Sequence, residues 1–306
     1  MREVVLSAQH LSKYFISGKH IHKVVDGVSF SVYRGETLGI VGESGSGKTT
    51  LGRTLMRLYE PDQGEITFDG HDITHLKRKK LRSVQRDFQM IFQDPFDSLS
   101  PRMTVGEILA EPLIIQKSHS RPERSKLVSS FLDKVGLPQT ANHKKIHEFS
   151  GGERQRVGIA RALIVQPKMV IADEPVSALD VSVQAQILNL LKDLQAELSL
   201  TCLFISHDLN VVHYMSDRVA VMRHGHMLEL ATKQQIYENP VHPYTKSLLS
   251  AIPVNTPHKR GMIREVIELP PRSLHPPHLI DIGGGHLVAA DVITIDNYRV
   301  KETQNV

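Results

Sequence analysis

The sequence contains a single cysteine among its 306 residues, Cys202, and no long apolar run. One cysteine cannot form an internal disulfide bond, so the small disulfide-stabilised folds are excluded. The longest apolar runs, at 38–41 and 169–172, are far shorter than the roughly 20 residues of a membrane-spanning helix. Residues 1–7 lack the apolar stretch of a secretory signal. We therefore expect a globular protein in a reducing, cytoplasmic setting that does not cross a membrane by itself.

The excess of positive charge is local. Lysine and arginine number 37 against 33 acidic residues, for a net charge of +4 and a pI of about 9.0. Such a pI suggests a nucleic-acid partner. However, six basic residues and no acid fall between Lys77 and Arg86, and without them the net charge is −2. The simplest interpretation of this basic run is a solvated charged face. The alternative is attraction to anionic lipid headgroups, worth about 1 kcal/mol per basic residue near the surface.

Hydrophobic patterning predicts alternating strands and helices. Short apolar or alternating segments indicate strands, and longer segments with apolar residues three or four positions apart indicate helices. Strands are expected at 28–32, 37–41, 64–70, 169–172, 203–205 and 219–222. Helices are expected at 49–58, within 104–136, from 152 to about 165, and at 181–198. This alternation is typical of an α/β fold whose mostly parallel sheet is covered on both faces.

A glycine-rich loop follows the strand expected at 37–41. Residues 42–49 match the phosphate-loop pattern G-x-x-x-x-G-K-[ST] without a mismatch. Glycines let the backbone curl so that N–H groups face phosphate oxygens, and the helix N-terminus adds positive charge. Lys48 is expected to reach the β- and γ-phosphates and Thr49 to bind Mg²⁺, so the chain should bind a nucleoside triphosphate. The predicted phosphate-binding residues are Gly42, Glu43, Ser44, Gly45, Ser46, Gly47, Lys48, Thr49 and Thr50.

Two acids, Asp173 and Glu174, end the hydrophobic strand at 169–172. Buried carboxylates are costly unless they are paired or bind a metal, so adjacent acids at this place suggest a catalytic site. Asp173 is expected to hold Mg²⁺ through water, and Glu174 to polarise the attacking water as a general base. Taken alone, the pair could equally be a solvated acidic turn; beside a phosphate loop, it predicts hydrolysis of the bound nucleotide.

A serine and two glycines open the next helix, in the segment Phe149-Ser150-Gly151-Gly152-Glu153. A helix start of this kind forms a second anion site. The segment resembles the L-S-G-G-Q signature of ATP-binding-cassette (ABC) ATPases, with Phe149 in place of leucine and Glu153 in place of glutamine. The resemblance implies that two cassettes pack head to tail. Ser150, Gly151 and Gly152 then contact the γ-phosphate that the partner holds, and the cofactors are ATP and Mg²⁺.

Further positions match the same family one at a time. Gln93 resembles the glutamine that senses Mg²⁺ and the attacking water and faces the membrane partner. Asp180 resembles a residue of the loop that crosses the dimer interface, and His207 resembles the switch histidine that contacts the γ-phosphate. Tyr14 occupies the place of an aromatic residue that stacks on adenine, although neighbouring Phe15 competes for that role.

The resemblance also implies a domain organisation. Residues 1–240 are expected to form the cassette: a P-loop NTPase core with a mostly parallel sheet, an antiparallel β subdomain, and a helical subdomain inserted at about 95–165. Prolines multiply after residue 240, which indicates that residues 241–306 form a separate extension.

The C-terminal extension resembles one branch of the family. Residues 237–249, and later 274–278 and 285–288, resemble the extension of oligopeptide, dipeptide and nickel importers. Many members of that branch carry several cysteines there that hold an iron–sulfur cluster. No cysteine follows Cys202 in this chain, so no such cluster is expected.

The branch implies a function and partners. The chain is expected to be the ATP-hydrolysing subunit of an importer of oligopeptides or dipeptides, bound peripherally at the cytoplasmic face of the inner membrane. Its expected partners are a second ATPase subunit (a copy or a paralogue), membrane permeases contacted near Gln93, and indirectly an extracytoplasmic peptide-binding protein, with no nucleic acid. The alternative is a soluble ABC ATPase linked to nucleic acid, whose hydrolysis would depend on DNA or RNA and strongly on salt.

Several reactive side chains are given ordinary roles. His71 with His75, and His143 with His147, have the i, i+4 spacing of metal ligands. No cysteine or acidic cluster completes either pair, so a solvated face is expected there. Cys202 is expected to be buried in a core strand and inert.

Overall fold

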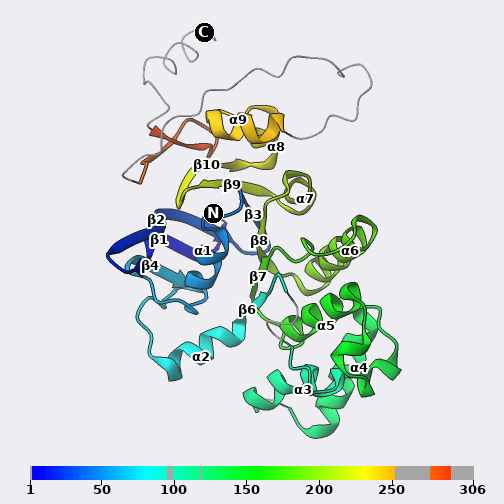
Figure 1. The fold of residues 1–306 in the computed structure, drawn as a ribbon. Helices are drawn as coiled ribbons and strands as arrows, with labels where there is room; N and C mark the ends of the chain where they lie inside the picture. The colour runs from blue at the N-terminus through cyan, green and yellow to red at the C-terminus, as the bar shows by residue number, and fades with distance from the viewer. Residues whose placement is uncertain (1, 95–98, 118, 252–275, 291–306) are drawn as a thin grey trace, which may run out of the picture. The chain divides into compact units, whose positions relative to one another are not determined.

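The computed structural model describes residues 2–94, 99–117, 119–251 and 276–290. The chain forms two compact units (Figure 1). The first unit contains Met1–Val5, Val32–Glu36 and Phe68–Phe204, and the second contains Leu6–Ser31, Thr37–Thr67 and Ile205–Val306.

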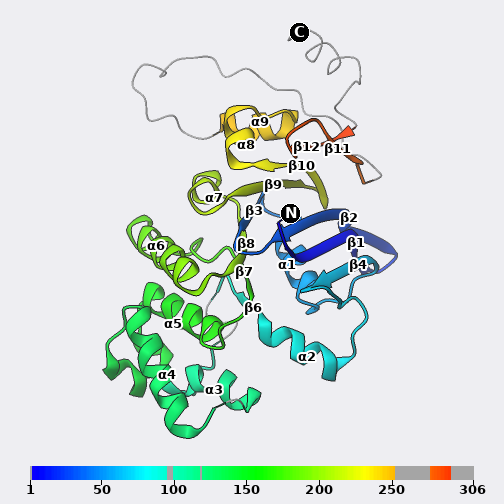
Figure 2. The ribbon, with the colours of Figure 1, turned by 180° about the vertical axis from the view of Figure 1, so that it is seen from behind.

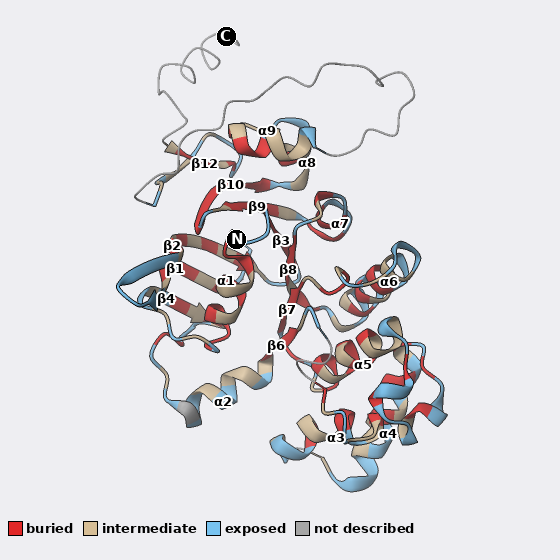
Figure 3. Ribbon diagram, viewed as in Figure 1, coloured by how far each residue is buried: buried red, intermediate tan, exposed pale blue. Residues whose placement is uncertain are grey.

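Buried parallel strands form the sheet of the first unit. Strand β6 (Phe88–Ile91) pairs in parallel with β7 (Met169–Asp173), with Phe88 opposite Met169. Strand β8 (Thr201–Ser206) is the other neighbour of β7. All five residues of β7 are buried (Figure 3), which accounts for its unbroken apolar sequence. The two strands expected in this region are confirmed.

Besides these strands and the short strand β5 (His71–Asp72), the described part of the first unit holds five α-helices. They are α2 (Arg78–Asp87), α3 (Val105–Gln116), α4 (Arg121–Lys134), α5 (Gly151–Leu163) and α6 (Val181–Leu198), with 3₁₀ turns at Gln139–His143 and Ile146–Glu148. Helices α3, α4 and α5 pack against one another, as both views show (Figures 1 and 2). This group lies within the range predicted for the helical subdomain, and α6 has the predicted bounds.

The helical stretch predicted after Thr104 is divided into α3 and α4. Helix α3 begins with a capping box, in which the Thr104 hydroxyl accepts from Glu107 N–H (3.3 Å) and the Glu107 carboxylate accepts from Thr104 N–H (2.8 Å). The helix ends at Lys117, whose φ is +54°. Helices commonly end on a glycine in this conformation, so a lysine there leaves no sequence signal. Ser120 and Pro122 do mark the start of α4.

Five strands are neighbours in the second unit. In spatial order they are β11 (Leu279–Asp281), β12 (Leu287–Ala289), β10 (His226–Thr232), β9 (Arg218–Arg223) and β3 (Thr37–Val41). Strands β3 and β9 are parallel, and the other pairs are antiparallel. Strand β3 is buried throughout and has the predicted bounds.

The sequence did not predict β10. Its first six residues are all buried, among them a glutamate, Glu229. Its pairing with β9 also shifts register between Met227 and Glu229. The alternation that signals a half-buried strand is therefore absent.

A smaller sheet holds β2 (His20–Tyr33), β1 (Val4–Ser17) and β4 (Gln63–Phe68) as neighbours. Only Gly18, with a φ of +61°, and Lys19 lie between β1 and β2. Such a short connection joins antiparallel strands, as the predicted β subdomain requires.

Four short helices lie among the described residues of the second unit. They are α1 (Lys48–Leu55), α7 (Leu209–Met215), α8 (Lys233–Glu238) and α9 (Pro243–Ser250). Helix α1 stops three residues before the predicted end at Leu58. Helix α8 packs against β9 and β10, so the chain after residue 240 begins beside the sheet. Two later segments, 274–278 and 285–288, were predicted to resemble the importer extension. The structure describes residues 276–278 and 285–288, whereas Leu274 and His275 lie outside the described residues.

Two surface predictions can be compared with the structure. No helix among the described residues is long and apolar enough to span a membrane. Helix α2 contains most of the basic run, and Lys79, Lys80, Arg82 and Arg86 on it are exposed, as expected for a solvated charged face. The attraction of this helix to lipid headgroups stays a prediction.

Candidate functional site

The glycine-rich loop of the second unit is shaped for an anion. Gly47 caps α1 with a φ of +103°, and a Cβ atom there would collide with the carbonyl oxygen of Val24. A Cβ atom at Gly42 would collide with the carbonyl oxygen of Met222. Gly45, by contrast, has a φ of +79° and open space beside it. The loop is thus closely packed on its inner side and open where a ligand would approach.

Lys48 places a buried positive charge in this loop. Its Nζ donates to the carbonyl oxygens of Gly42 (2.7 Å) and Glu43 (2.8 Å) and to Ser46 Oγ (3.3 Å). These oxygens hold the ammonium group beside the backbone of the loop. A lysine held there, in the first turn of α1, fits the binding of a phosphate group. Thr49 and Thr50 are half-buried in the first turn of α1.

Neighbouring segments of the second unit hold the loop. Gly225 N–H donates to the Ser46 carbonyl (2.9 Å), and Asp26 N–H donates to the Gly225 carbonyl (3.0 Å). On the other side, Glu43 N–H donates to the hydroxyl of Tyr244 (3.2 Å), which lies on α9. No sequence pattern indicates this last contact, because it joins residues 201 positions apart.

The two candidates for adenine stacking differ in exposure. The Tyr14 hydroxyl donates to Asp26 Oδ1 (3.1 Å), and Lys23 Nζ lies 5.4 Å from the centre of the Tyr14 ring. The Phe15 ring is 37% exposed and makes an edge contact with Tyr59. Lys13 Nζ likewise lies 5.5 Å from the centre of the Phe15 ring. Exposure is therefore what distinguishes the two residues: Phe15 is exposed and Tyr14 is half-buried.

The acidic residues of the first unit form a second group. Asp173 is buried at the end of β7. Glu174 follows with a φ of +45°, a strained conformation for a residue other than glycine that is common at functional sites. Gln93 Nε2 donates to Glu174 Oε2 and to Ser177 Oγ, both at 3.3 Å, and Ser177 Oγ donates to the Glu174 carbonyl (3.1 Å). The structure thus brings together Gln93 and Glu174, which were each predicted to act on the attacking water, and places Ser177 beside them.

Ser150 caps α5 in the same unit. Its hydroxyl accepts from Glu153 N–H (3.4 Å), and the Glu153 carboxylate accepts from the backbone N–H and hydroxyl of Ser150, both at 2.8 Å. These two bonds lower the pKa of the Glu153 carboxyl, so it is ionised at neutral pH. A Cβ atom at Gly152 would press on Val183, near the start of α6. The signature segment therefore packs against the segment that contains Asp180.

The remaining predicted residues lie at element ends. Asp180 is the exposed N-cap of α6, and His207 is exposed directly after β8. The phosphate loop, Tyr14 and His207 belong to the second unit, and Gln93, Asp173, Glu174, Ser150 and Asp180 belong to the first.

The four paired histidines and Cys202, which were not predicted to belong to the site, can be compared with the structure. His71, His75, His143 and His147 are exposed. Cys202 is half-buried rather than fully buried. Desolvation nevertheless raises the pKa of its thiol to about 12, so the thiol stays protonated and unreactive at neutral pH.

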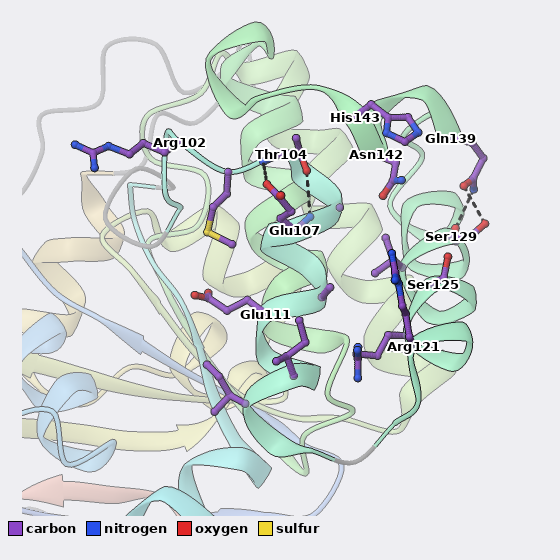
Figure 4. Close-up of a pocket in the computed structure, with 17 residues that line it drawn as sticks. Arg102, Thr104, Glu107, Glu111, Arg121, Ser125, Ser129, Gln139, Asn142 and His143 are labelled. Carbon is purple, nitrogen blue, oxygen red and sulfur yellow. Dashed lines mark hydrogen bonds between the residues drawn. The ribbon is translucent and has the colours of Figure 1, made fainter.

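A large pocket of about 1270 Å³ lies among α3, α4 and the 3₁₀ turn at Gln139–His143 (Figure 4). It is lined by polar side chains such as Arg121 and Asn142 and by two exposed isoleucines, Ile114 (53%) and Ile115 (71%). No residue predicted to bind nucleotide lines it. This part of the first unit therefore offers a separate surface.

Two family models match the sequence. One, described as ABC transporter, matches residues 25–177, and the other, described as the oligopeptide/dipeptide transporter C-terminal region, matches residues 228–278. The oligopeptide transport ATP-binding protein OppF of Bacillus subtilis (strain 168) is 53% identical over 268 residues, which are 87% of this chain and 88% of that protein. AppF of the same organism, also an oligopeptide transport ATP-binding protein, is 53% identical over 271 residues, 86% of this chain and 82% of that protein.

Solved structures share the fold. The dimeric ATP-binding cassette MJ0796, in a post-hydrolysis state with ADP and Pi, aligns with a TM-score of 0.69 at 30% identity, covering 74% of this chain and 98% of that one. CbiO1 from Clostridium perfringens, part of the ABC transporter complex cbiONQ, aligns with a TM-score of 0.69 at 27% identity, covering 78% and 92%. The predicted fold class is confirmed.

Proposed function

Because the chain belongs to the ABC transporter family, we propose that it hydrolyses ATP to drive the import of oligopeptides or dipeptides. The family resemblance read from the sequence is confirmed, and the chain binds nucleotide, as members of the family do. The observation that carries the substrate class is the match of the C-terminal segment, added to the likeness to two oligopeptide transport proteins. The alternative linked to nucleic acid receives no support from these matches.

Separate residues are proposed to bind the phosphates, hold Mg²⁺ and accept the proton of water. The loop at 42–47 and Lys48 bind the phosphates of ATP, as the buried ammonium and the open side of the loop support. Thr49, Asp173 and Gln93 are the proposed holders of Mg²⁺, which neutralises phosphate charge when bound. Glu174 takes the proton of the attacking water.

Two further side chains act on the same reaction. Gln93 donates to the Glu174 carboxylate, so it orients the general base toward the attacking water. His207 contacts the γ-phosphate in this proposal. Its exposed position directly after β8 is compatible with that role.

We propose Phe15 rather than its neighbour Tyr14 for adenine recognition, because Phe15 is the more exposed of the two. We expect Phe15→Ala to weaken ATP binding about tenfold, since stacking of a base on an aromatic ring is worth roughly 1–3 kcal/mol. Tyr14→Phe is the matched control. It removes the hydroxyl contact with Asp26 and should leave affinity within about twofold. Calorimetric titration with ATP decides between them, and the reverse pattern would return the role to Tyr14.

The signature segment serves a partner subunit. Ser150, Gly151 and Gly152 close over the nucleotide that a second cassette holds, and Asp180 lies at the same interface. Val181, beside Asp180, is 82% exposed, so a partner packed at this interface would bury its apolar side chain. The partner is a second copy of this chain or a related ATPase.

The extent of the two domains is part of the proposal. Residues 1–240 form the ATPase domain, with its helical part at about 95–165, and residues 241–306 form the extension. The family model for the C-terminal region begins at residue 228, so the extension is continuous with β10.

Membrane permeases are proposed to bind in the pocket between α3 and α4. The chain is also proposed to lie peripherally at the cytoplasmic face of the inner membrane. An extracytoplasmic peptide-binding protein would deliver substrate to these permeases. The support is the pair of exposed isoleucines in a hollow that nucleotide does not need.

We expect Ile115→Asp to abolish stimulation of hydrolysis by the permeases while leaving the basal hydrolysis of the purified chain unchanged. A carboxylate in place of this isoleucine removes apolar contact area and adds a charge that must be desolvated when the permease binds. Ile21→Asp, at another exposed isoleucine on β2, is the control. Equal stimulation in both variants would place the permease contact elsewhere.

Purification of the tagged chain from membranes tests the function as a whole. The importer hypothesis predicts that permeases co-purify and that added DNA or RNA has no effect on hydrolysis. Hydrolysis that rises with nucleic acid and falls steeply with salt would support the other class of ATPase.

A further inference from the structure

The C-terminal extension reaches the phosphate loop through one side chain. Tyr244, the second residue of α9, is only 1% exposed. Its hydroxyl oxygen accepts a hydrogen bond from Glu43 N–H at 3.2 Å, and its ring faces the guanidinium carbon of Arg223 at 4.9 Å. The hydroxyl is therefore fixed at the edge of the loop by a buried ring.

The bond holds a peptide unit that takes part in the site. The N–H of the Gly42–Glu43 peptide donates to Tyr244, and the C=O of the same peptide accepts from Lys48 Nζ at 2.7 Å. Lys48 is the residue proposed to reach the phosphates. When its ammonium turns toward a phosphate, its contact with the Gly42 carbonyl weakens, and Tyr244 remains to fix the peptide.

A buried carboxylate in turn fixes Tyr244. Glu229 on β10 accepts from the backbone N–H groups of Val241 (2.9 Å) and His242 (3.1 Å) and lies 2.7 Å from His286 Nε2. His242 Nδ1 accepts from Tyr244 N–H at 3.0 Å. The first turn of α9 is thus tied to β10 and to the residue that precedes β12.

The charge of Glu229 is maintained by these contacts. Burial alone would raise the pKa of the carboxyl, but the hydrogen bonds from His286 and from the backbone of Val241 and His242 outweigh it and hold the pKa below its usual range. Glu229 is therefore an anion, and it makes strong, charge-assisted hydrogen bonds to the chain that carries Tyr244.

The geometry points to Tyr244 as a positioning residue of the phosphate loop, through which the C-terminal extension sets the affinity of this chain for nucleotide. The inference rests on the proposed function, because it needs the loop to bind ATP or ADP. The C-terminal extension would then act on the phosphate loop of its own chain, in addition to any contact that it makes with partners. Holding the loop in its bound conformation beforehand reduces the entropy lost on binding.

Tyr244→Phe removes the hydroxyl and keeps the ring. We expect the Kd for MgADP, measured by calorimetry on the full chain, to rise about fivefold, the size of effect that one net hydrogen bond gives. ADP is the probe because it contacts the loop without being hydrolysed. Tyr237→Phe is the matched control. Tyr237 lies on α8, and the substitution removes a hydroxyl that donates to the carbonyl of Leu209 rather than to the phosphate loop. Its Kd should stay within twofold of wild type.

Amide hydrogen exchange distinguishes a local effect on the phosphate loop from a general loss of stability in the second unit. The Glu43 amide should exchange faster in Tyr244→Phe and not in Tyr237→Phe, while amides of β9 and β10 keep their protection in both variants. An unchanged Kd would overturn the inference, and so would weaker binding accompanied by faster exchange throughout the second unit. If the wild-type chain neither bound nor hydrolysed nucleotide, the proposed function would fail instead, and the exchange of the Glu43 amide would still report whether Tyr244 holds the loop.

Discussion

Replacing Glu174 with glutamine should slow ATP hydrolysis by about 100-fold or more, the contribution typical of a general base, while ATP still binds. The amide has nearly the shape of the carboxylate, and its oxygen can still accept the hydrogen bond that Gln93 donates to Glu174. The geometry of the group therefore survives, and only the ability to take a proton from water is lost. The measurement is steady-state phosphate release at saturating ATP.

The same variant should accumulate as an ATP-bound dimer. If ATP closes the two cassettes and hydrolysis reopens them, a chain that binds without hydrolysing stays closed, and light scattering should show twice the monomer mass when ATP is present. Glu107→Gln is the control, since the Glu107 carboxylate also accepts a hydrogen bond, from Thr104 N–H, but only caps α3. Hydrolysis at the wild-type rate in Glu174→Gln would sink the assignment of the base.

Replacing Ser150 with arginine should have the second large effect. In the proposed dimer, Ser150 lies against the γ-phosphate held by the partner, so a long cationic side chain there blocks closure. We expect hydrolysis to fall by about 100-fold or more, comparable to the loss of a group that stabilises charge in the transition state. Binding of ATP to the same chain should stay near wild type, because its phosphate loop belongs to the other unit.

The control for this substitution must also lose a helix cap. Ser120 precedes α4 as Ser150 precedes α5, and Glu123 accepts from Ser120 N–H at 2.7 Å, as Glu153 does from Ser150. Ser120→Arg therefore disturbs an equivalent capping box outside the signature segment. ATP-dependent dimerisation should persist in Ser120→Arg and vanish in Ser150→Arg. If both variants dimerise alike, the signature does not serve a partner.

The residues predicted from the sequence were those whose role depends on local spacing. The phosphate loop needs glycine where the backbone approaches Met222 and Val24, and that need is visible as G-x-x-x-x-G-K-[ST]. Gln93 was identified through family resemblance, and its contact with Glu174, 81 residues away, was not predicted. Strands β3 and β7 were found because they are buried throughout, which makes their sequences continuously apolar.

What could not be predicted depends on contacts distant in sequence. Tyr244 meets Glu43 only because Glu229, His242 and His286 fix the chain that carries it, and no local pattern encodes that meeting. The left-handed conformation of Lys117 at the end of α3 runs against the usual preference for glycine, so the residue type carried no signal of the helix end. The choice between Tyr14 and Phe15 likewise required the exposure of the two side chains, because the two residues are neighbours in one strand.

The most direct test of peptide import uses the chain assembled with its permeases in lipid vesicles. Uptake of a labelled oligopeptide is measured with the peptide-binding protein on the opposite side from the ATPase. We predict uptake that requires ATP on the side of this chain and is absent in the Glu174→Gln complex. A wild-type complex that hydrolyses ATP yet accumulates no peptide, or one that accumulates peptide equally well without ATP, would contradict the proposed function.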